Sequence, residues 1–263
     1  MNWLEALILG IIQGLTEFLP VSSSGHLELG KAILGVNAEK SLMFTVVVHG
    51  ATVLSTIVVF YKDLLKLIKG LFAFKWNEET SYVARIIMSM IPVIILGLFF
   101  KEEVEGFFTG NVMLVGFMLI ITSMLLMSTY IVKRNERKIS FIDAFVIGIA
   151  QALAVLPGIS RSGATISTGL LLGNKKANIA RFSFLMVLIP IIGANFKDLY
   201  DGSAGGENGI GLIPLLVGFV AAFISGLLAC KWMIGIVKKG KLIYFAIYCF
   251  LIGSTAIIYT LAF

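Results

Sequence analysis

The most constraining feature of this sequence is a series of apolar segments, each long enough to cross a lipid bilayer as a helix. Roughly 20 apolar residues span the hydrocarbon core of a membrane. Six segments reach that length: 41–61, 82–100, 111–132, 178–198, 211–236 and 242–262. Only 14% of the 263 residues are charged, whereas soluble domains carry about 25%. We therefore expect an all-α polytopic membrane protein rather than a soluble globule.

Two further apolar stretches are interrupted by polar residues and a proline. The first covers 2–35 and breaks around Pro20, and the second covers 141–172 and breaks around Pro157. Behind each break lies an apolar piece of about ten residues, which is too short to span. We predict that both stretches are re-entrant hairpins, each made of a helix, a polar turn and a short return helix.

The two interrupted stretches resemble each other. Gln13-Gly-Leu matches Gln151-Ala-Leu, and each break continues from a proline into a Ser-x-Ser-Gly sequence. The match predicts one membrane domain, 1–263, built of two repeats, 1–138 and 139–263, each a hairpin plus three spans. Three crossings per repeat invert the second repeat in the membrane. Inverted repeats with broken helices place a polar site near the bilayer midplane, where the repeats meet.

Basic residues indicate the orientation. With the N-terminus outside, the inside loops are 62–81, 133–140, 173–177 and 237–241, and with their flanks they hold 16 of the 21 Lys and Arg residues. Four fall outside, Lys31, Lys40, Lys101 and Lys197, and Arg161 lies in the second hairpin. Because Lys and Arg favour the cytoplasmic side, both termini are expected outside. The same pattern explains the net charge of +6 without nucleic acid as a partner. The start lacks a basic n-region, so we expect the first helix to be retained.

The first hairpin carries polar groups at membrane depth, where a functional role is the default interpretation. Gln13 and Glu17 are four residues apart and share one helix face. The serines after Pro20 can cap the return helix, whose free N–H groups favour an anion. An imidazole near a carboxylate and hydroxyls suits acid–base or nucleophilic catalysis. The candidate residues here are Gln13, Glu17, Ser22, Ser23, Ser24, Gly25 and His26.

The second hairpin adds a guanidinium group to an equivalent turn. Arg161 can bind a phosphate through two parallel hydrogen bonds, next to a second helix N-terminus. The candidate residues here are Gly158, Ser160, Arg161, Ser162, Gly163 and Thr165. The other histidine, His49, is expected to make a helix–helix hydrogen bond rather than to contact substrate. If the two turns converge, the donors outnumber what one carboxylate can satisfy, which predicts a buried anion site.

These motifs identify a resemblance. Gln13-Gly-Leu-Thr-Glu17-Phe-Leu-Pro20-Val-Ser-Ser-Ser-Gly25-His26 and Pro157-Gly-Ile-Ser-Arg161-Ser-Gly-Ala-Thr165 resemble the bacterial undecaprenyl pyrophosphate phosphatase family, also called the bacitracin-resistance protein family. The resemblance covers essentially the whole chain. It implies a cytoplasmic-membrane enzyme that hydrolyses a C55 polyprenyl diphosphate to the monophosphate, recycling the lipid carrier for cell-wall synthesis. Bacitracin competes for that diphosphate, so the activity confers resistance.

The resemblance also implies roles for single residues. The family's Glu/Gln-x-x-x-Glu motif falls on Gln13 and Glu17, its essential histidine on His26, a catalytic serine on Ser23 and its arginine on Arg161. Many members have Glu where this chain has Gln13, which weakens a cation site. The family's Mg²⁺ or Ca²⁺ is therefore expected to bridge Glu17 and the diphosphate. The nucleophile is left open among Ser23, His26 and water. A lipid or anion transporter on the same repeat is the alternative function, and no feature indicates an oligomeric state.

Overall fold

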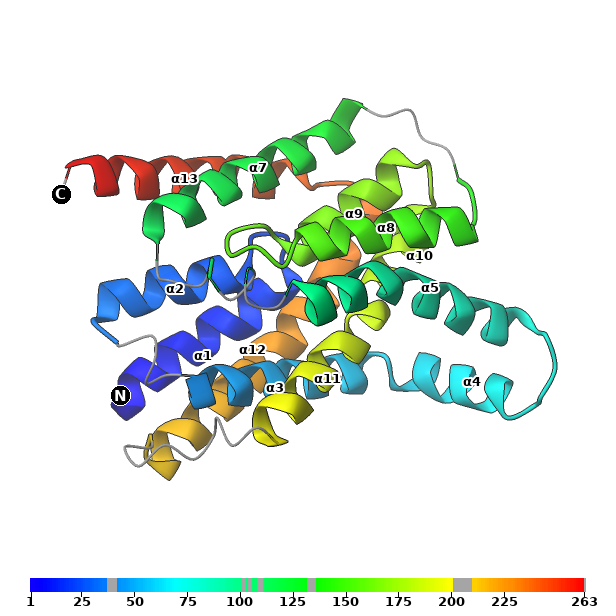
Figure 1. Ribbon diagram of the computed structural model, residues 1–263, viewed down its shortest axis with the longest axis horizontal. Helices are drawn as coiled ribbons and strands as arrows, with labels where there is room; N and C mark the ends of the chain where they lie inside the picture. The colour runs from blue at the N-terminus through cyan, green and yellow to red at the C-terminus, as the bar shows by residue number, and fades with distance from the viewer. Residues whose placement is uncertain are drawn as a thin grey trace.

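The computed structural model describes residues 1–36, 42–100, 103, 106–107, 111–131, 136–200 and 210–262. This part of the chain is helical, with one isolated bridge between Arg137 and Asn174 as its only β-type pairing (Figure 1). The expected all-helical membrane protein is confirmed at this level. Some basic residues used for the orientation lie outside the described residues, namely Lys40, Lys101, Lys133 and Arg134.

Five helical segments are long and apolar enough to span a membrane. They are α5 (Glu78–Phe99), α7 (Val112–Ile131), Lys176–Gly193, α12 (Leu212–Lys239) and α13 (Ile243–Ala262). The segment from Lys176 is divided into α10 (Lys176–Met186) and α11 (Leu188–Tyr200). The break at Val187 precedes Pro190, whose ring nitrogen cannot donate to the carbonyl of Met186. These segments overlap five of the six spans expected from the sequence.

The sixth expected span corresponds to α3 (Leu42–Val59), which is followed after a 76° bend by α4 (Tyr61–Leu71). The sequence interpretation treated 62–81 as a loop, and this was wrong for α4. The helix is strongly amphipathic. Leu67 is buried and Leu64 is partly buried, so this side of the helix faces the protein, while the lysines of the helix are exposed. This helix was missed in the sequence because it is short and of mixed composition, and its lysines were counted as loop charges.

Both interrupted stretches form helix–turn–helix hairpins. The first consists of α1 (Trp3–Phe18) and α2 (Ser23–Leu34), and the second of α8 (Phe141–Leu153) and α9 (Arg161–Leu171). The return helices have 12 and 11 residues, so each is less than about 20 Å long and too short to cross a bilayer. Ser22 caps α2 by accepting from the N–H of Gly25, and Ser160 caps α9 in the same way.

The hairpins lie against spanning helices in matching ways. α1 packs along α12, α8 packs along α5, and α7 packs along α13 (Figure 1). Glycines permit the close crossings. A Cβ on Gly10 would lie 2.5 Å from the carbonyl oxygen of Gly218, and one on Gly148 would lie 2.4 Å from that of Ser89. Gly10 in α1 and Gly148 in α8 occupy matching positions in the two similar stretches. The first helix of each hairpin therefore approaches its neighbour through the same kind of contact.

Candidate active site

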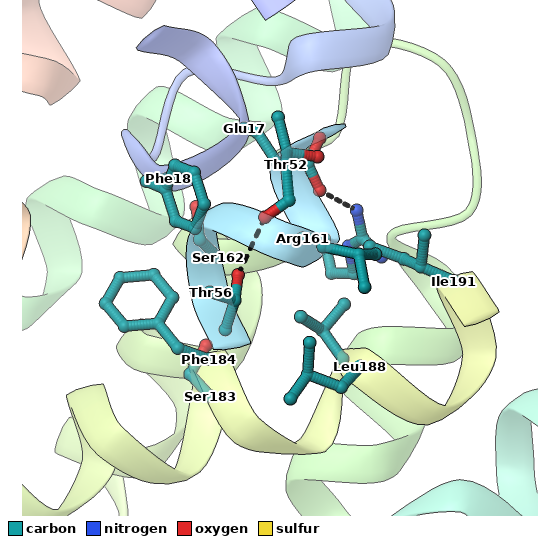
Figure 2. Close-up of a pocket in the computed structure, with 12 residues that line it drawn as sticks. Glu17, Phe18, Thr52, Thr56, Arg161, Ser162, Ser183, Phe184, Leu188 and Ile191 are labelled. Atoms are coloured by element: carbon teal, nitrogen blue, oxygen red, sulfur yellow. Dashed lines mark hydrogen bonds and ion pairs between the residues drawn. The ribbon is translucent and has the colours of Figure 1, made fainter. Parts of the chain in front are cut away.

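A buried carboxylate joins the two hairpins. Glu17 lies at the end of α1, and its side chain is only 5% exposed. The guanidinium of Arg161, at the start of α9, donates to Glu17 Oε1 at 2.5 Å (Figure 2). Glu17 Oε2 accepts from Gln13 Nε2 at 2.8 Å and from Ser23 Oγ at 2.7 Å. Four of the residues singled out in the sequence are therefore in direct contact, across 144 positions of the chain.

The turns themselves touch. A Cβ on Gly25 would lie 3.1 Å from the Cα of Gly158, so the two glycines are in backbone contact. Ser162 Oγ donates to the carbonyl oxygen of Leu19 at 3.2 Å. This close approach explains why both turns contain a Ser-x-Ser-Gly sequence. Small residues let the starts of α2 and α9 meet.

Helix α7 holds the second turn in place. Thr122 Oγ1 donates to the carbonyl oxygen of Gly158 at 3.1 Å and accepts from the N–H of Ser160 at 2.9 Å. Gly158 has φ +99°, and a Cβ there would lie 2.6 Å from the carbonyl oxygen of Val115. The turn that presents Arg161 is thus fixed by backbone contacts to a spanning helix.

Most other candidate hydroxyls are engaged by the protein. Ser22 and Ser160 serve as helix caps. Thr165 is buried, donates to the carbonyl oxygen of Arg161 at 2.8 Å, and lies 2.6 Å from Ser183 Oγ. Thr165 therefore orients the first turn of α9, while Ser23 is the hydroxyl that reaches the Glu17 carboxylate.

His26 does not point toward the Glu17 group. Its Nδ1 lies 2.9 Å from the carbonyl oxygen of Ser22, and its Nε2 lies 2.8 Å from the hydroxyl of Tyr248 on α13. The His26 and Tyr248 rings are stacked, with centroids 5.5 Å apart. Because a carbonyl oxygen only accepts, Nδ1 is the donor, and when the ring is neutral the Tyr248 hydroxyl donates to Nε2. The sequence indicated the imidazole but not its direction, and nothing in the apolar run around Tyr248 marks this partner.

Tyr248→Phe removes the hydroxyl that meets His26 and retains the ring stack. We expect the free energy of unfolding to fall by about 1 kcal/mol, because one hydrogen bond that orients the imidazole is lost. Tyr244→Phe, on the exposed side of the same helix, is the matched control and should change nothing. Thermal unfolding of the purified variants measures both effects. An unaltered unfolding temperature in Tyr248→Phe would mean that this hydroxyl does not hold the His26 ring.

His49, expected to serve helix packing, lies at the site instead. Its Nδ1 is 2.8 Å from the carbonyl oxygen of Thr45 within α3, and its Nε2 is 3.8 Å from Glu17 Oε2. The signal in the sequence was its depth in an apolar span, where an ionisable side chain has a functional role by default. The structure thus places His49, rather than His26, beside the Glu17 carboxylate.

Two hollows adjoin this group. A small cavity of about 20 Å³ lies beside Glu17, Arg161 and Thr52 (Figure 2), with room for about one water molecule. A larger cavity of about 360 Å³ is lined by Ser23, Ser24, His49 and Arg161 among others. Arg161 borders both. The larger volume lies within the range of small-molecule binding sites. Its polar lining comes from both hairpins, from Thr45 and His49 of α3, and from Asn195 of α11.

The donor set does not form a resident metal site. Among the described residues, no group of three or more His, Cys, Asp or Glu side chains is placed to hold an ion. Both oxygens of Glu17 already accept hydrogen bonds from Gln13, Ser23 and Arg161. A divalent cation usually needs several oxygen ligands. The geometry instead suits an anion that competes with Glu17 for the guanidinium.

Comparison with known proteins identifies the family of this chain. Residues 6–255 match the family described as bacitracin resistance protein BacA. A protein of Bacteroides thetaiotaomicron named undecaprenyl-diphosphatase is 58% identical over 262 residues, covering 98% of this chain and 99% of that protein. One of Christiangramia forsetii with the same name is 57% identical over the full length of both chains. A relative in Carboxydothermus hydrogenoformans, also so named, is 40% identical over 98% of this chain and 97% of its own length.

Proposed function

The chain belongs to the bacitracin resistance protein BacA family, and on this basis we propose that it hydrolyses undecaprenyl diphosphate to undecaprenyl phosphate and inorganic phosphate. The reaction recycles the lipid carrier of cell-wall synthesis and supports bacitracin resistance. One observation carries the assignment to a site: the Arg161–Glu17 pair, with Ser23 on the same carboxylate, joins the two hairpins, and Arg161 and Ser23 line the 360 Å³ cavity.

We place the chain in the bacterial cytoplasmic membrane as six spans and two re-entrant hairpins, arranged as an inverted repeat. The matching contacts of α1 with α12 and of α8 with α5 support the repeat. The lysines of α4 and the basic residues around 173–177 and 237–241 support an orientation with both termini outside. The hairpin that carries Glu17 then opens outward, so the diphosphate enters from the external side.

In the proposed mechanism, Arg161 exchanges its carboxylate partner for the diphosphate. A guanidinium has five N–H donors and binds phosphate oxygens in a fork, so the terminal phosphate competes with Glu17 Oε1. The released carboxylate is then free to accept a proton. Ser23 Oγ already donates to Glu17 Oε2 at 2.7 Å, so Glu17 is the base in contact with Ser23, whereas the His26 ring contacts Ser22 and Tyr248.

The bond that breaks joins the terminal phosphorus to the bridging oxygen. That oxygen and its electron pair leave with the lipid monophosphate, while Arg161 stabilises the charge that develops. Either Ser23 Oγ attacks and forms a phosphoserine that water then hydrolyses, or water attacks directly. In both routes the nucleophile gives its proton to Glu17. Rapid quench and mass spectrometry distinguish them, because only the first route leaves a phosphate on Ser23.

We propose that a divalent cation enters the site bound to the diphosphate substrate. Because the protein offers Glu17 as one carboxylate ligand, Mg²⁺ or Ca²⁺ would be held mainly by diphosphate oxygens and retained waters. The ion would neutralise negative charge on the diphosphate in the cavity. Mutation of Glu17 would then weaken the effect of the ion without removing the ion from the substrate.

Purified protein in detergent is expected to release phosphate from farnesyl diphosphate, and EDTA is expected to lower the rate at least about tenfold, because the diphosphate loses its counter-ion. Excess Mg²⁺ should restore it. Bacitracin should also lower the rate by withdrawing substrate. Detergent removes compartments, so a transporter would yield no product. Absence of phosphate release in the presence of Mg²⁺ would refute the proposed hydrolysis.

A further inference from the structure

Gln151 is a buried amide whose hydrogen-bonding capacity is not used by the protein. It lies near the end of α8 and is 2% exposed. Its Oε1 has no donor among the described residues, and its Nε2 faces the sulfur of Met90 at 3.9 Å. A thioether is a weak acceptor. A buried polar group without a partner is destabilising, so its presence requires an explanation.

Comparison with the first hairpin shows which partner the Gln151 amide lacks. The Oε1 atom of Gln13, its counterpart in the first hairpin, also has no donor among the described residues, but the Nε2 of Gln13 donates to Glu17 four residues later. Four residues after Gln151 stands Val155. The second hairpin therefore keeps the amide without the carboxylate that would hold it. The first hairpin holds its glutamine against Glu17, and the second leaves its glutamine at the wall of the cavity.

Gln151 lines the 360 Å³ cavity together with Ser23 and Arg161. Much of the remaining wall is apolar, formed by Val46, Val93, Ala154, Val155, Ile159, Pro190 and Ile191. Two residues of this apolar wall, Ala154 and Val155, follow Gln151 closely in the chain. Rotation of the terminal amide by a half turn exchanges its oxygen and nitrogen, so that an N–H group takes the place of the oxygen that has no donor.

We propose that Gln151 binds the phosphate that remains on the lipid, an inference that rests on the proposed function. Ser23 and Arg161 then face the terminal phosphate, and the Gln151 amide donates to an oxygen of the inner phosphate, beside the apolar wall that receives the first isoprene units. After cleavage the inner phosphate keeps the bridging oxygen, so Gln151 holds the leaving group and the product. A neutral donor suits this role because it binds without retaining the product as tightly as a cation would.

The test is equilibrium binding by calorimetry, with detergent-solubilised Gln151→Leu and two probes, geranyl monophosphate and inorganic phosphate. The variant should bind geranyl monophosphate roughly ten- to a hundredfold more weakly, the effect of one buried hydrogen bond to a charged group. Its affinity for inorganic phosphate should stay within about twofold of the wild type. Its Tm should not fall, because leucine removes an oxygen that has no donor.

Met90→Leu is the matched control, since Met90 is the side chain that Gln151 contacts and the exchange preserves volume. It should bind both probes like the wild type. Unchanged affinity of Gln151→Leu for geranyl monophosphate, an equal loss for both probes, or the same loss in Met90→Leu would each overturn the proposal. The binding measurement needs no turnover, so failure of wild-type hydrolysis would refute the proposed function separately.

Discussion

Arg161→Ala is expected to lower phosphate release from a prenyl diphosphate about a thousandfold or more. In the proposed mechanism the guanidinium, which lines the cavity from the second hairpin, binds the charge that develops on the phosphate. The same change leaves Glu17 buried without its counter-charge. Removal of one member of a buried ion pair lowers the free energy of unfolding by about 3–5 kcal/mol, so the variant should also unfold at a lower temperature.

Two further variants separate catalysis from stability. Glu17→Gln combined with Arg161→Met removes both charges and should recover much of the stability but none of the activity. Arg137→Ala is the matched control. Arg137 donates to Asp143, whose side chain is 4% exposed and which lies near the start of α8, away from the turn that carries Arg161. The Arg137→Ala variant should lower stability, but each folded molecule should keep its turnover. Normal turnover in Arg161→Ala would contradict the site.

Gly158→Ala is expected to lower the free energy of unfolding by about 3 kcal/mol or more, from a disfavoured backbone conformation and a steric clash. Gly158 has φ +99°, and its Cβ would lie 2.6 Å from the carbonyl oxygen of Val115. A shifted turn would also move Arg161 away from Glu17. Misplacement of a catalytic group by about 1 Å can lower a rate a hundredfold, and we expect a loss of that order.

Gly35→Ala isolates the backbone contribution. Gly35 has φ +67° with no atom within 4 Å of the added Cβ, so this variant should lose only about 1–2 kcal/mol and keep full turnover. Thermal unfolding followed by tryptophan fluorescence, with phosphate release measured in parallel, compares the two. Equal losses of stability would show that α7 does not approach the second turn as closely as described.

The hairpins could be predicted because their signals are local. A proline, a Ser-x-Ser-Gly sequence and a short apolar piece specify a turn and a short helix wherever the chain packs. The meeting of Glu17 with Arg161 followed from the similarity of the two stretches, and the ion pair is observed. What a motif does not encode is the direction of a side chain. His26 was expected beside Glu17, but a hydroxyl 222 positions away, on Tyr248, binds its ring.

Two other differences between the sequence-based predictions and the structure have the same cause. His49 is one polar residue in an apolar span, and only the crossing of α3 near the end of α1 brings it to Glu17. Gln151 was recognised as the counterpart of Gln13 but not as a site residue, because its place at the cavity depends on α5 and α11 as well as on its own helix. Tertiary packing therefore decides which side chains line the site, while the sequence pattern predicts the helices and turns that carry them.

The contact between Glu17 and Arg161 also bears on biosynthesis. The two residues are separated by 144 positions, and ribosomes add about 5–20 residues per second. For roughly 7–30 seconds, then, the nascent first hairpin has its carboxylate but no guanidinium to neutralise it. The hairpin that carries Glu17 can therefore reach its final structure only after the second hairpin has been made and inserted.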